Sequence, residues 1–253
     1  MDWWIPPIAL AVGVLMGTLG GGGAILTVPI LTTLIGQTPR AATTGSLIIV
    51  GLSALIGVIP HLKTGRAKIA DGLTFGVLGS AGAFIGSHLS ATVRGPVLMV
   101  AFCALLLLVA AAMIRKQIRT TITGTTRRGW IARIGAATGV GLLTGFFGVG
   151  GGFVIVPALT LIMGLEMPAA VATSLLVIAI NSSTSLASRA TQELPLDWAT
   201  LLPFAALTAF GTLLGGRLTT RINQRALNLA FIALLILLAL GLAAQNLPEL
   251  INQ

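Results

Sequence analysis

Glycine is the residue type in this chain whose spacing can support chemistry. Two glycine clusters interrupt apolar stretches: Gly20, Gly21, Gly22 and Gly23, and then Gly148, Gly150, Gly151 and Gly152. A glycine run lets the backbone unwind and approach a ligand closely, because no side chain blocks the approach. A helix that restarts after such a break presents unpaired amides and a positive dipole end, which suit an anion. The two clusters therefore predict a paired anion-binding site.

The clusters belong to a pattern that occurs twice. Six residues of the first, Gly17, Gly20, Gly22, Gly23, Val28 and Pro29, recur 128 positions later as Gly145, Gly148, Gly150, Gly151, Val156 and Pro157. Interrupted hydrophobic segments at matching places in two halves of a membrane chain indicate a transporter's binding site. Tight helix packing is the alternative role of these glycines.

Polar side chains after each cluster are further candidates for contacting the substrate: Thr44, Ser46, Thr173, Ser174 and Asn181. Hydroxyl and amide groups can donate hydrogen bonds to an anion. Hydroxyls inside a helix also bond the carbonyl one turn back, and Asn181 can equally cap or bridge helices. Both interpretations stay open for each of these residues.

His88 is a candidate for coupling transport to protons, because histidine titrates near neutral pH. An interfacial histidine beside a loop is the alternative. We predict no catalytic or metal-binding residue and no cofactor, since the chain has no His-Glu-x-x-His helix, no Ser-His-Asp set and a single cysteine. An enzyme is not expected.

The composition is that of an all-α polytopic membrane protein. The chain has 253 residues, of which 55% are hydrophobic and 8% charged, whereas soluble domains average about 25% charged residues. Its net charge of +9 lies in short clusters between apolar segments, as the positive-inside bias leaves it. We therefore expect the lipid bilayer and a small anionic substrate as partners, with a second copy of the chain as a further candidate, and no nucleic acid.

The chain divides into two homologous repeats. The first, 1–114, has a glycine-broken segment at 5–36 and predicted spans at 41–59, 72–92 and 96–114, the first of which ends at Pro60. A basic linker occupies 115–129. The second repeat, 130–253, has its glycine-broken segment at 130–164 and spans at 168–186, 198–218 and 226–244. Four pairs of small residues predict close helix packing: Gly13/Gly17, Gly82/Gly86, Gly135/Gly139 and Gly211/Gly215.

The distribution of lysines and arginines favours one of two paths for the glycine-broken segments through the membrane. If both segments cross the membrane, ten basic residues face one side and five the other. If each is a re-entrant hairpin that returns to its own side, the division becomes twelve against three, which fits the positive-inside rule better. We predict an inverted repeat, each half being a hairpin plus three transmembrane helices, with the termini outside and the central linker cytoplasmic.

Together, the paired glycine segments and the Ala-x-x-x-Ser-Leu pattern after each, at 42–47 and 170–175, resemble the TauE/SafE family of membrane permeases. The resemblance covers almost the whole chain. It implies a bacterial inner-membrane transporter, often an exporter, of sulfite, sulfonates such as sulfoacetate, or related sulfur-containing anions. The first half departs slightly from the second, with Thr43-Thr44-Gly45 opposite Val171-Ala172-Thr173.

The function predicted from these observations is secondary transport, as an exporter, of a small sulfur-containing oxyanion. Alternating access between the halves would expose the paired glycine breaks to each side in turn. Two alternatives remain: an anion channel, and a non-transporting membrane partner of a cytoplasmic enzyme docked through the basic linker.

Overall fold

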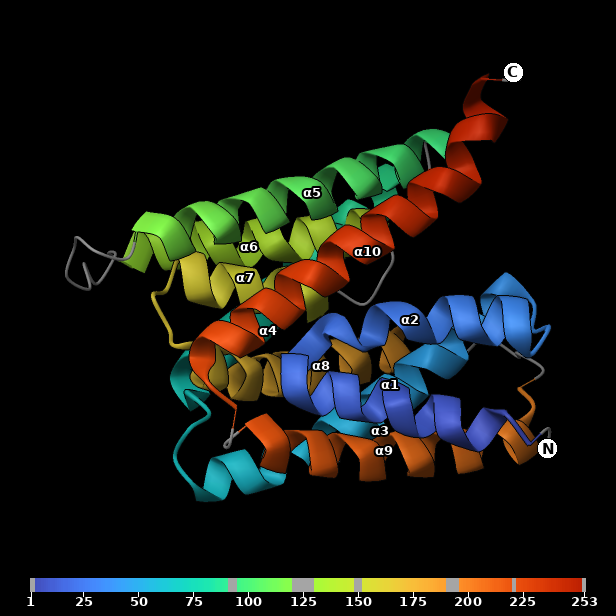
Figure 1. Cartoon of the computed structure of the whole chain (residues 1–253), viewed down its shortest axis with the longest axis horizontal. Coiled ribbons are helices and arrows are strands. Elements are labelled where there is room, and N and C mark those ends of the chain that lie inside the picture. The colour runs from blue at the N-terminus through green and yellow to red at the C-terminus, as the bar shows by residue number, and fades with distance from the viewer. Residues whose placement is uncertain are drawn as a thin grey trace.

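The structure is a computed structural model that describes residues 3–90, 95–119, 130–147, 152–189, 196–219 and 222–251. Every regular element in these ranges is helical, so the prediction of an all-α protein is confirmed. The helices lie roughly along the long axis of the molecule, as Figure 1 shows. Each long helix therefore starts near one end of this helical bundle and stops near the other.

The first half begins with α1 (Ile5–Leu19), a 3-10 turn (Gly20–Gly22) and the short α2 (Ala24–Pro29), which continues as a π-helical turn (Ile30–Leu34). Three long helices follow: α3 (Pro39–Lys63), α4 (Ile69–Ser90) and α5 (Gly95–Arg119). The second half repeats the order with α6 (Trp130–Phe147), α7 (Gly152–Leu161), α8 (Met167–Arg189), α9 (Trp198–Thr219) and α10 (Gln224–Ile251).

Seven stretches of the described chain are long and apolar enough to cross a membrane, so the protein is a multi-pass membrane protein. They are Ile5–Gly22, Ala41–Lys63, Ile69–Gly86, Val100–Gln117, Met167–Ala187, Trp198–Thr219 and Gln224–Ala244. Six of them lie over the spans predicted from the sequence, and the additional one is the first arm of the first glycine-broken segment.

Helix starts follow the usual capping chemistry. Thr38 caps α3, where its hydroxyl accepts a hydrogen bond from the Ala41 amide, and Pro39 occupies the first turn. Asp197 caps α9 by accepting from the Ala199 amide at 3.2 Å and the Thr200 hydroxyl at 2.6 Å. The Thr200 hydrogen bond lowers the pKa of Asp197.

The prediction that Pro60 ends its span is wrong, because α3 continues to Lys63. A proline breaks a helix by removing one hydrogen bond and crowding the preceding turn. Pro60 lies in the exposed last turn, where the Thr64 amide still reaches the Pro60 carbonyl at 3.2 Å. The loop between α3 and α4 is therefore shorter than predicted, at 64–68.

Parallel helix pairs show at which end of the bundle α1 and α6 begin. Helices α3 and α9 run in the same direction, since Gly45 lies beside Leu201 and Gly57 beside Thr212. Helix α4 starts after the short loop at the end of α3, and therefore at the opposite end of the bundle from the start of α9. Because α1 packs in parallel with α9, and α6 with α4, α1 and α6 begin at opposite ends (Figure 1).

The packing is reciprocal between the two halves. Helix α1 packs against α9, and its counterpart α6 packs against α4. Helix α3 crosses its counterpart α8, and α5 lies along its counterpart α10. Exchanging the two halves therefore leaves these helix contacts unchanged. In Figure 1, α5 and α10 lie side by side at one edge of the molecule.

Three of the four small-residue pairs form close crossings, as predicted. A Cβ atom added at Gly13, Gly17, Gly82, Gly86, Gly211 or Gly215 would meet a backbone oxygen of the facing helix. The prediction is wrong for Gly135 and Gly139, because a Cβ there would have no atom within 4 Å in the described chain. Gly141 makes the contact instead, against Gly79. It lies about 200° around the helix from Gly139, on the face that meets α4.

Candidate functional site

The first glycine break is a true interruption of the helix. Helix α1 ends at Leu19, and Gly20 has φ +68° and ψ −127°, a backbone conformation that only glycine adopts without strain. A Cβ at Gly20 would collide with the Ser174 hydroxyl and would lie 2.9 Å from Val156 Cγ2. The turn at Gly20 therefore faces α7 and α8, both of which belong to the second half.

The second break lies between the end of α6 at Phe147 and the start of α7 at Gly152. The predicted ligands Gly148, Gly150 and Gly151 fall outside the described residues. Gly152 is described, and it lies against Gly21, with no room for a Cβ atom on either residue. The two glycine breaks are therefore in backbone-to-backbone contact.

The remaining glycines of the first cluster have other neighbours. A Cβ at Gly23 would lie 2.6 Å from the Val12 carbonyl oxygen, so Gly23 lets α2 start close to α1. A Cβ at Gly22 would lie 2.9 Å from Leu234 Cδ2 and 3.6 Å from Phe231 Cε2, both on α10. Within this cluster, Gly21 thus meets the second glycine cluster at Gly152, and Gly20 faces α7 and α8.

The polar residues of α8 divide between two roles. Ser174 is fully buried beside Gly20, and its hydroxyl donates to the Val171 carbonyl at 2.8 Å. Thr173 is also fully buried, but its hydroxyl accepts a hydrogen bond from the Lys68 amide at 3.0 Å. Ser174 therefore lies at the break, whereas Thr173 holds the start of α4 against α8.

Asn181 bridges two helices, which is one of the roles its sequence context allowed. Its Oδ1 accepts a hydrogen bond from the Ser80 hydroxyl at 3.1 Å, which ties α8 to α4. Its counterpart in the first half, Ser53, is fully buried, and the Ser53 hydroxyl has no hydrogen-bond partner among the described residues. At matching positions, α8 therefore has an amide that bonds to α4, whereas α3 has a hydroxyl without a described partner.

Thr44 and Ser46 are buried near the start of α3. The Ser46 hydroxyl donates to the Thr43 carbonyl at 3.1 Å. In the repeat, Ser46 corresponds to Ser174 and Gly148 corresponds to Gly20. By this correspondence Ser46 would face Gly148, which lies outside the described residues.

Sequence reasoning missed buried polar groups, of which His61 and Thr27 are two. His61, which lies between the predicted spans 41–59 and 72–92, is in the last turn of α3 and is 3% exposed. Its Nε2 lacks a partner among the described residues. The spacing Ser53, Gly57, His61 places all three on one face of α3, a signal that was available in the sequence. Thr27 of α2 is likewise fully buried with an unpartnered hydroxyl. The side chain of His88, the predicted proton-coupling residue, is outside the description.

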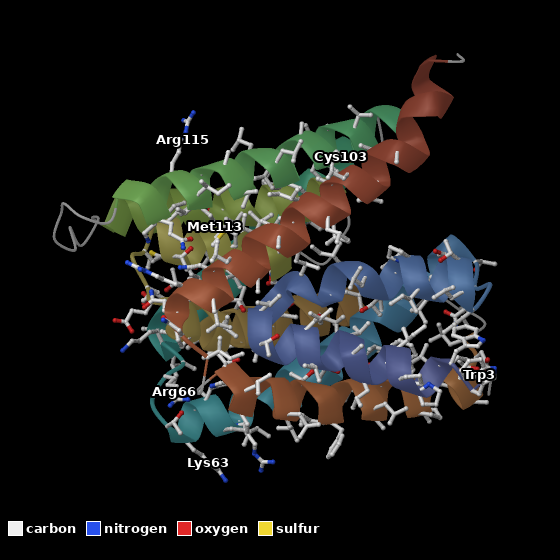
Figure 2. The ribbon with its side chains drawn as sticks, in the orientation of Figure 1. Trp3, Lys63, Arg66, Cys103, Met113 and Arg115 are labelled. Atoms are coloured by element: carbon white, nitrogen blue, oxygen red, sulfur yellow. The ribbon has the colours of Figure 1, made fainter. Side chains whose placement is uncertain are left out.

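Basic residues gather at one end of the bundle. Figure 2 labels Lys63 and Arg66 at the end opposite Trp3. Arg217 lies in the last turn of α9, the helix that runs parallel to α3 and therefore ends beside it. Lys116 of α5 and Arg225 of α10 line a common cavity with residues from the end of α7 and the start of α8. Among the described residues, groups of three or more histidine, cysteine and acidic side chains that could hold a metal ion are absent.

Comparison with known proteins identifies the family. The profile described as Sulfite exporter TauE/SafE matches residues 5–242. A probable membrane transporter protein of Xylella fastidiosa is 32% identical over 239 residues, covering 90% of each chain. The probable membrane transporter protein YunE of Bacillus subtilis is 27% identical, covering 86% of this chain and 88% of YunE.

A probable membrane transporter protein of the archaeon Methanocaldococcus jannaschii is 24% identical over 233 residues. No solved structure matches the chain significantly. The family is one of membrane transporters rather than enzymes. With nearly its whole length matched and a glycine cluster at the same place in each of its two halves, this chain belongs to the Sulfite exporter TauE/SafE family.

Proposed function

We propose that this protein is a secondary transporter that exports a small sulfur-containing oxyanion, such as sulfite or an organosulfonate. The observation that carries the proposal is the contact between Gly21 and Gly152. It joins two helix breaks that occupy matching positions in the two repeats. Discontinuous helices that meet at a repeat interface form the substrate sites of many secondary transporters.

The chemistry at the breaks suits an oxyanion. The backbone of Gly20 to Gly22 leaves the α-helical path, so amides there are not committed to a regular helix. Helix α7 starts at Gly152 and directs the positive end of its dipole toward the same place. The Ser174 hydroxyl adds a side-chain donor beside Gly20. An anion held there needs no arginine buried in the membrane.

The set of residues that we propose to bind the oxyanion or to shape its site keeps all the residues predicted from the sequence. It comprises Gly20, Gly21, Gly22, Gly23, Thr44, Ser46, Gly148, Gly150, Gly151, Gly152, Thr173, Ser174 and Asn181. Contacts of the described residues support Gly20, Gly21, Gly152 and Ser174 most directly. Thr173 and Asn181 have hydrogen bonds that hold helices together, so we assign them to shaping the site.

We further propose that the two glycine-broken segments are re-entrant hairpins of an inverted repeat. Opposite starting ends of α1 and α6 support this arrangement. The turn after α2 returns toward the start of α3, since Leu31 and Gln37 lie near Gly45. The end of α7 returns to the end of α5, where the Lys116 ammonium donates to the Thr160 carbonyl. Each segment thus leaves the bundle at the end where it entered.

The charge distribution supports an orientation with the basic end and the 115–129 linker in the cytoplasm and both termini outside the inner membrane. Cysteine labels at the termini and at about Thr123 test it. Labelling by a membrane-impermeant reagent from opposite sides is the expected result. Labelling of all three positions from one side would contradict the inverted repeat.

Alternating access would then be a rocking of one half against the other about the glycine contact. Flux of radiolabelled sulfite and methanesulfonate into proteoliposomes tests the proposed function. Saturable flux that exchanges across the membrane is expected. Single-channel currents would instead support an anion channel, and absence of flux with a stoichiometric co-purifying enzyme would support a membrane partner.

Proton coupling through His88 is the remaining part of the proposal. If His88 carries the coupled proton, His88→Gln leaves the flux unresponsive to an imposed pH gradient, while the uncoupled exchange of substrate persists. His61→Gln serves as the comparison, since His61 is the other histidine of the chain. A pH response that survives His88→Gln and disappears in His61→Gln would transfer the role to His61.

A further inference from the structure

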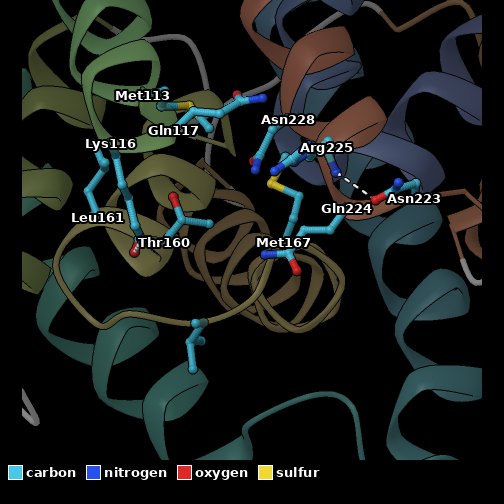
Figure 3. A pocket seen from close by; sticks show the side chains of 11 residues that line it. Met113, Lys116, Gln117, Thr160, Leu161, Met167, Asn223, Gln224, Arg225 and Asn228 are labelled. Atoms are coloured by element: carbon cyan, nitrogen blue, oxygen red, sulfur yellow. Dashed lines mark hydrogen bonds between the residues drawn. The ribbon is translucent and has the colours of Figure 1, made fainter. Parts of the chain in front are cut away.

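A polar cavity of about 380 Å³ lies at the basic end of the bundle, far along α7 from the glycine breaks. Four segments enclose it: the end of α5, the end of α7, the turn that leads into α8, and the start of α10. Figure 3 shows how their side chains surround it. It is lined by Met113, Lys116, Gln117, Thr160, Leu161, Leu165, Met167, Asn223, Gln224, Arg225 and Asn228.

The polar side chains that line this cavity are two cations, four amides that can each donate or accept, and the Thr160 hydroxyl. Lys116 and Arg225 approach it from α5 and α10, and four amide side chains come from Gln117, Asn223, Gln224 and Asn228. The described lining includes no acidic residue. The Lys116 ammonium donates to the Thr160 carbonyl, and an ammonium has three protons to donate. The electrostatics of the cavity therefore favour an anion.

A second hollow, of about 560 Å³, lies along α5. Its described lining is Leu108, Ala111, Ala112, Arg115 and Lys116, so the two hollows share Lys116. The spacing of these residues places them on one face of the helix. Apart from the two basic residues at its end, this groove is lined by aliphatic side chains.

The surface around the groove is apolar, as expected of a face turned to lipid. Leu108, which lines the groove on α5, is 66% exposed. A basic pocket at the end of an apolar, lipid-facing groove combines the two features that bind an anionic lipid: cations for the headgroup and hydrocarbon for the chain.

We propose that the cavity and groove together bind one anionic phospholipid. Its phosphate lies in the cavity near Lys116 and Arg225, and an acyl chain lies along the α5 groove. The bound lipid links α5, α7 and α10. Its phosphate contacts Lys116 of α5, which donates to the end of α7, and Arg225 of α10. This inference rests on the membrane location of the protein and not on the identity of its transported anion.

Native mass spectrometry of the full-length protein in detergent tests the proposal, with phosphatidylglycerol and phosphatidylcholine offered in competition. We expect one phosphatidylglycerol to remain bound in preference to phosphatidylcholine. Each cation near a membrane surface contributes about a fivefold increase in affinity for anionic lipid. The double variant Lys116→Gln/Arg225→Gln is therefore expected to lower the phosphatidylglycerol affinity by about thirtyfold.

The control Lys63→Gln/Arg66→Gln removes the same charge from the same end of the bundle but from residues outside the cavity lining. It is expected to keep the preference. Since Lys116→Gln also removes the hydrogen bond to Thr160, Arg225→Gln alone provides a variant that spares this contact, with an expected loss of about fivefold.

Three results would overturn the proposal. The first is an unchanged lipid preference in both Arg225→Gln and the double variant. The second is an equal loss in the Lys63→Gln/Arg66→Gln control, which would indicate a diffuse surface charge effect. The third is complete displacement of phosphatidylglycerol by millimolar inorganic phosphate, which would show that the cavity is a site for free oxyanions and the groove is not used.

Discussion

Glycine permits close backbone contact at two kinds of place in this molecule, and the two differ in backbone geometry. Where α1 crosses α9, Gly13 and Gly17 belong to an uninterrupted helix, and their missing side chains let the facing carbonyls of Thr208 and Thr212 come near. At the breaks, Gly21 and Gly152 also touch, but Gly20 beside them has a positive φ and the helix stops.

The difference separates a packing contact from a candidate site. In the crossing, the backbone amides are bonded within their helices, so the contact can only hold the helices together. At Gly20 to Gly22 the backbone leaves the α-helical path, and such an interruption can free amides for a ligand. Close approach alone therefore does not identify a binding site; close approach combined with an interrupted helix does.

The largest expected effect comes from adding one methyl group at the contact between the breaks. A Cβ at Gly21 would overlap Gly152, so we expect Gly21→Ala to abolish anion flux in proteoliposomes. Forcing extra atoms into a packed interface costs about 1–3 kcal/mol. Gly72→Ala is the control outside the proposed ligand set, since its Cβ would meet the movable end of the Leu176 side chain. Equal flux in the two variants would show that the contact between the breaks is not needed.

The crossing provides the contrasting result. Gly13→Ala would press a Cβ against the Thr208 carbonyl and is expected to lower the thermal unfolding midpoint. In the fraction that remains folded, the KM for the anion should be unchanged. A raised KM in Gly13→Ala would erase the distinction between the two kinds of glycine contact.

The next effect concerns the positive φ of Gly20. Gly20→Ala adds a penalty of about 1–3 kcal/mol for a backbone conformation that residues other than glycine avoid, and a collision with the Ser174 hydroxyl. The double variant Gly20→Ala/Ser174→Gly relieves the collision with the hydroxyl. It retains the backbone penalty and the approach of 2.9 Å to Val156 Cγ2, and it also lacks the Ser174 donor. We expect it to recover only part of the lost flux. Full recovery would show that the conformation of Gly20 is unimportant.

A smaller effect is expected from Ser174→Ala, which removes a hydroxyl without adding atoms. A neutral hydrogen bond contributes about 0.5–1.5 kcal/mol, so the KM should rise by up to about tenfold with little change in stability. Ser183→Ala removes a similarly back-bonded hydroxyl from an exposed position on the same helix, and its KM should match that of the wild type. Equal KM values for both variants would remove Ser174 from the site.

The smallest expected effect is a stabilisation. Gly139 lies within α6, and a Cβ there would have no described atom within 4 Å. Gly139→Ala should therefore raise the free energy of unfolding by about 0.5–1 kcal/mol, because glycine is a poor helix residue. Flux should not change. Destabilisation, measured by denaturant unfolding in detergent, would mean that Gly139 has a packing role after all.

Much of the fold was accessible from the sequence because a membrane imposes simple rules. Twenty or so apolar residues predict a spanning helix, and six predicted spans coincide with long apolar helices. The repeat related the glycine clusters without reference to structure. Pro60 was misjudged, since sequence does not reveal that the last turn of a helix tolerates proline. Gly139 was misjudged because small-residue spacing is present on more than one face of α6.

The candidate site shows the same division. Residue types alone determined that the chain has two glycine breaks, few acids to repel an anion, and hydroxyls that follow each break. Only the tertiary structure decided that Gly21 meets Gly152, that Gly22 and Gly23 face other helices, and that Thr173 is occupied by the Lys68 amide. The physical reason is that composition and spacing govern which segments enter the membrane, whereas helix rotation and crossing decide which residues of each segment meet.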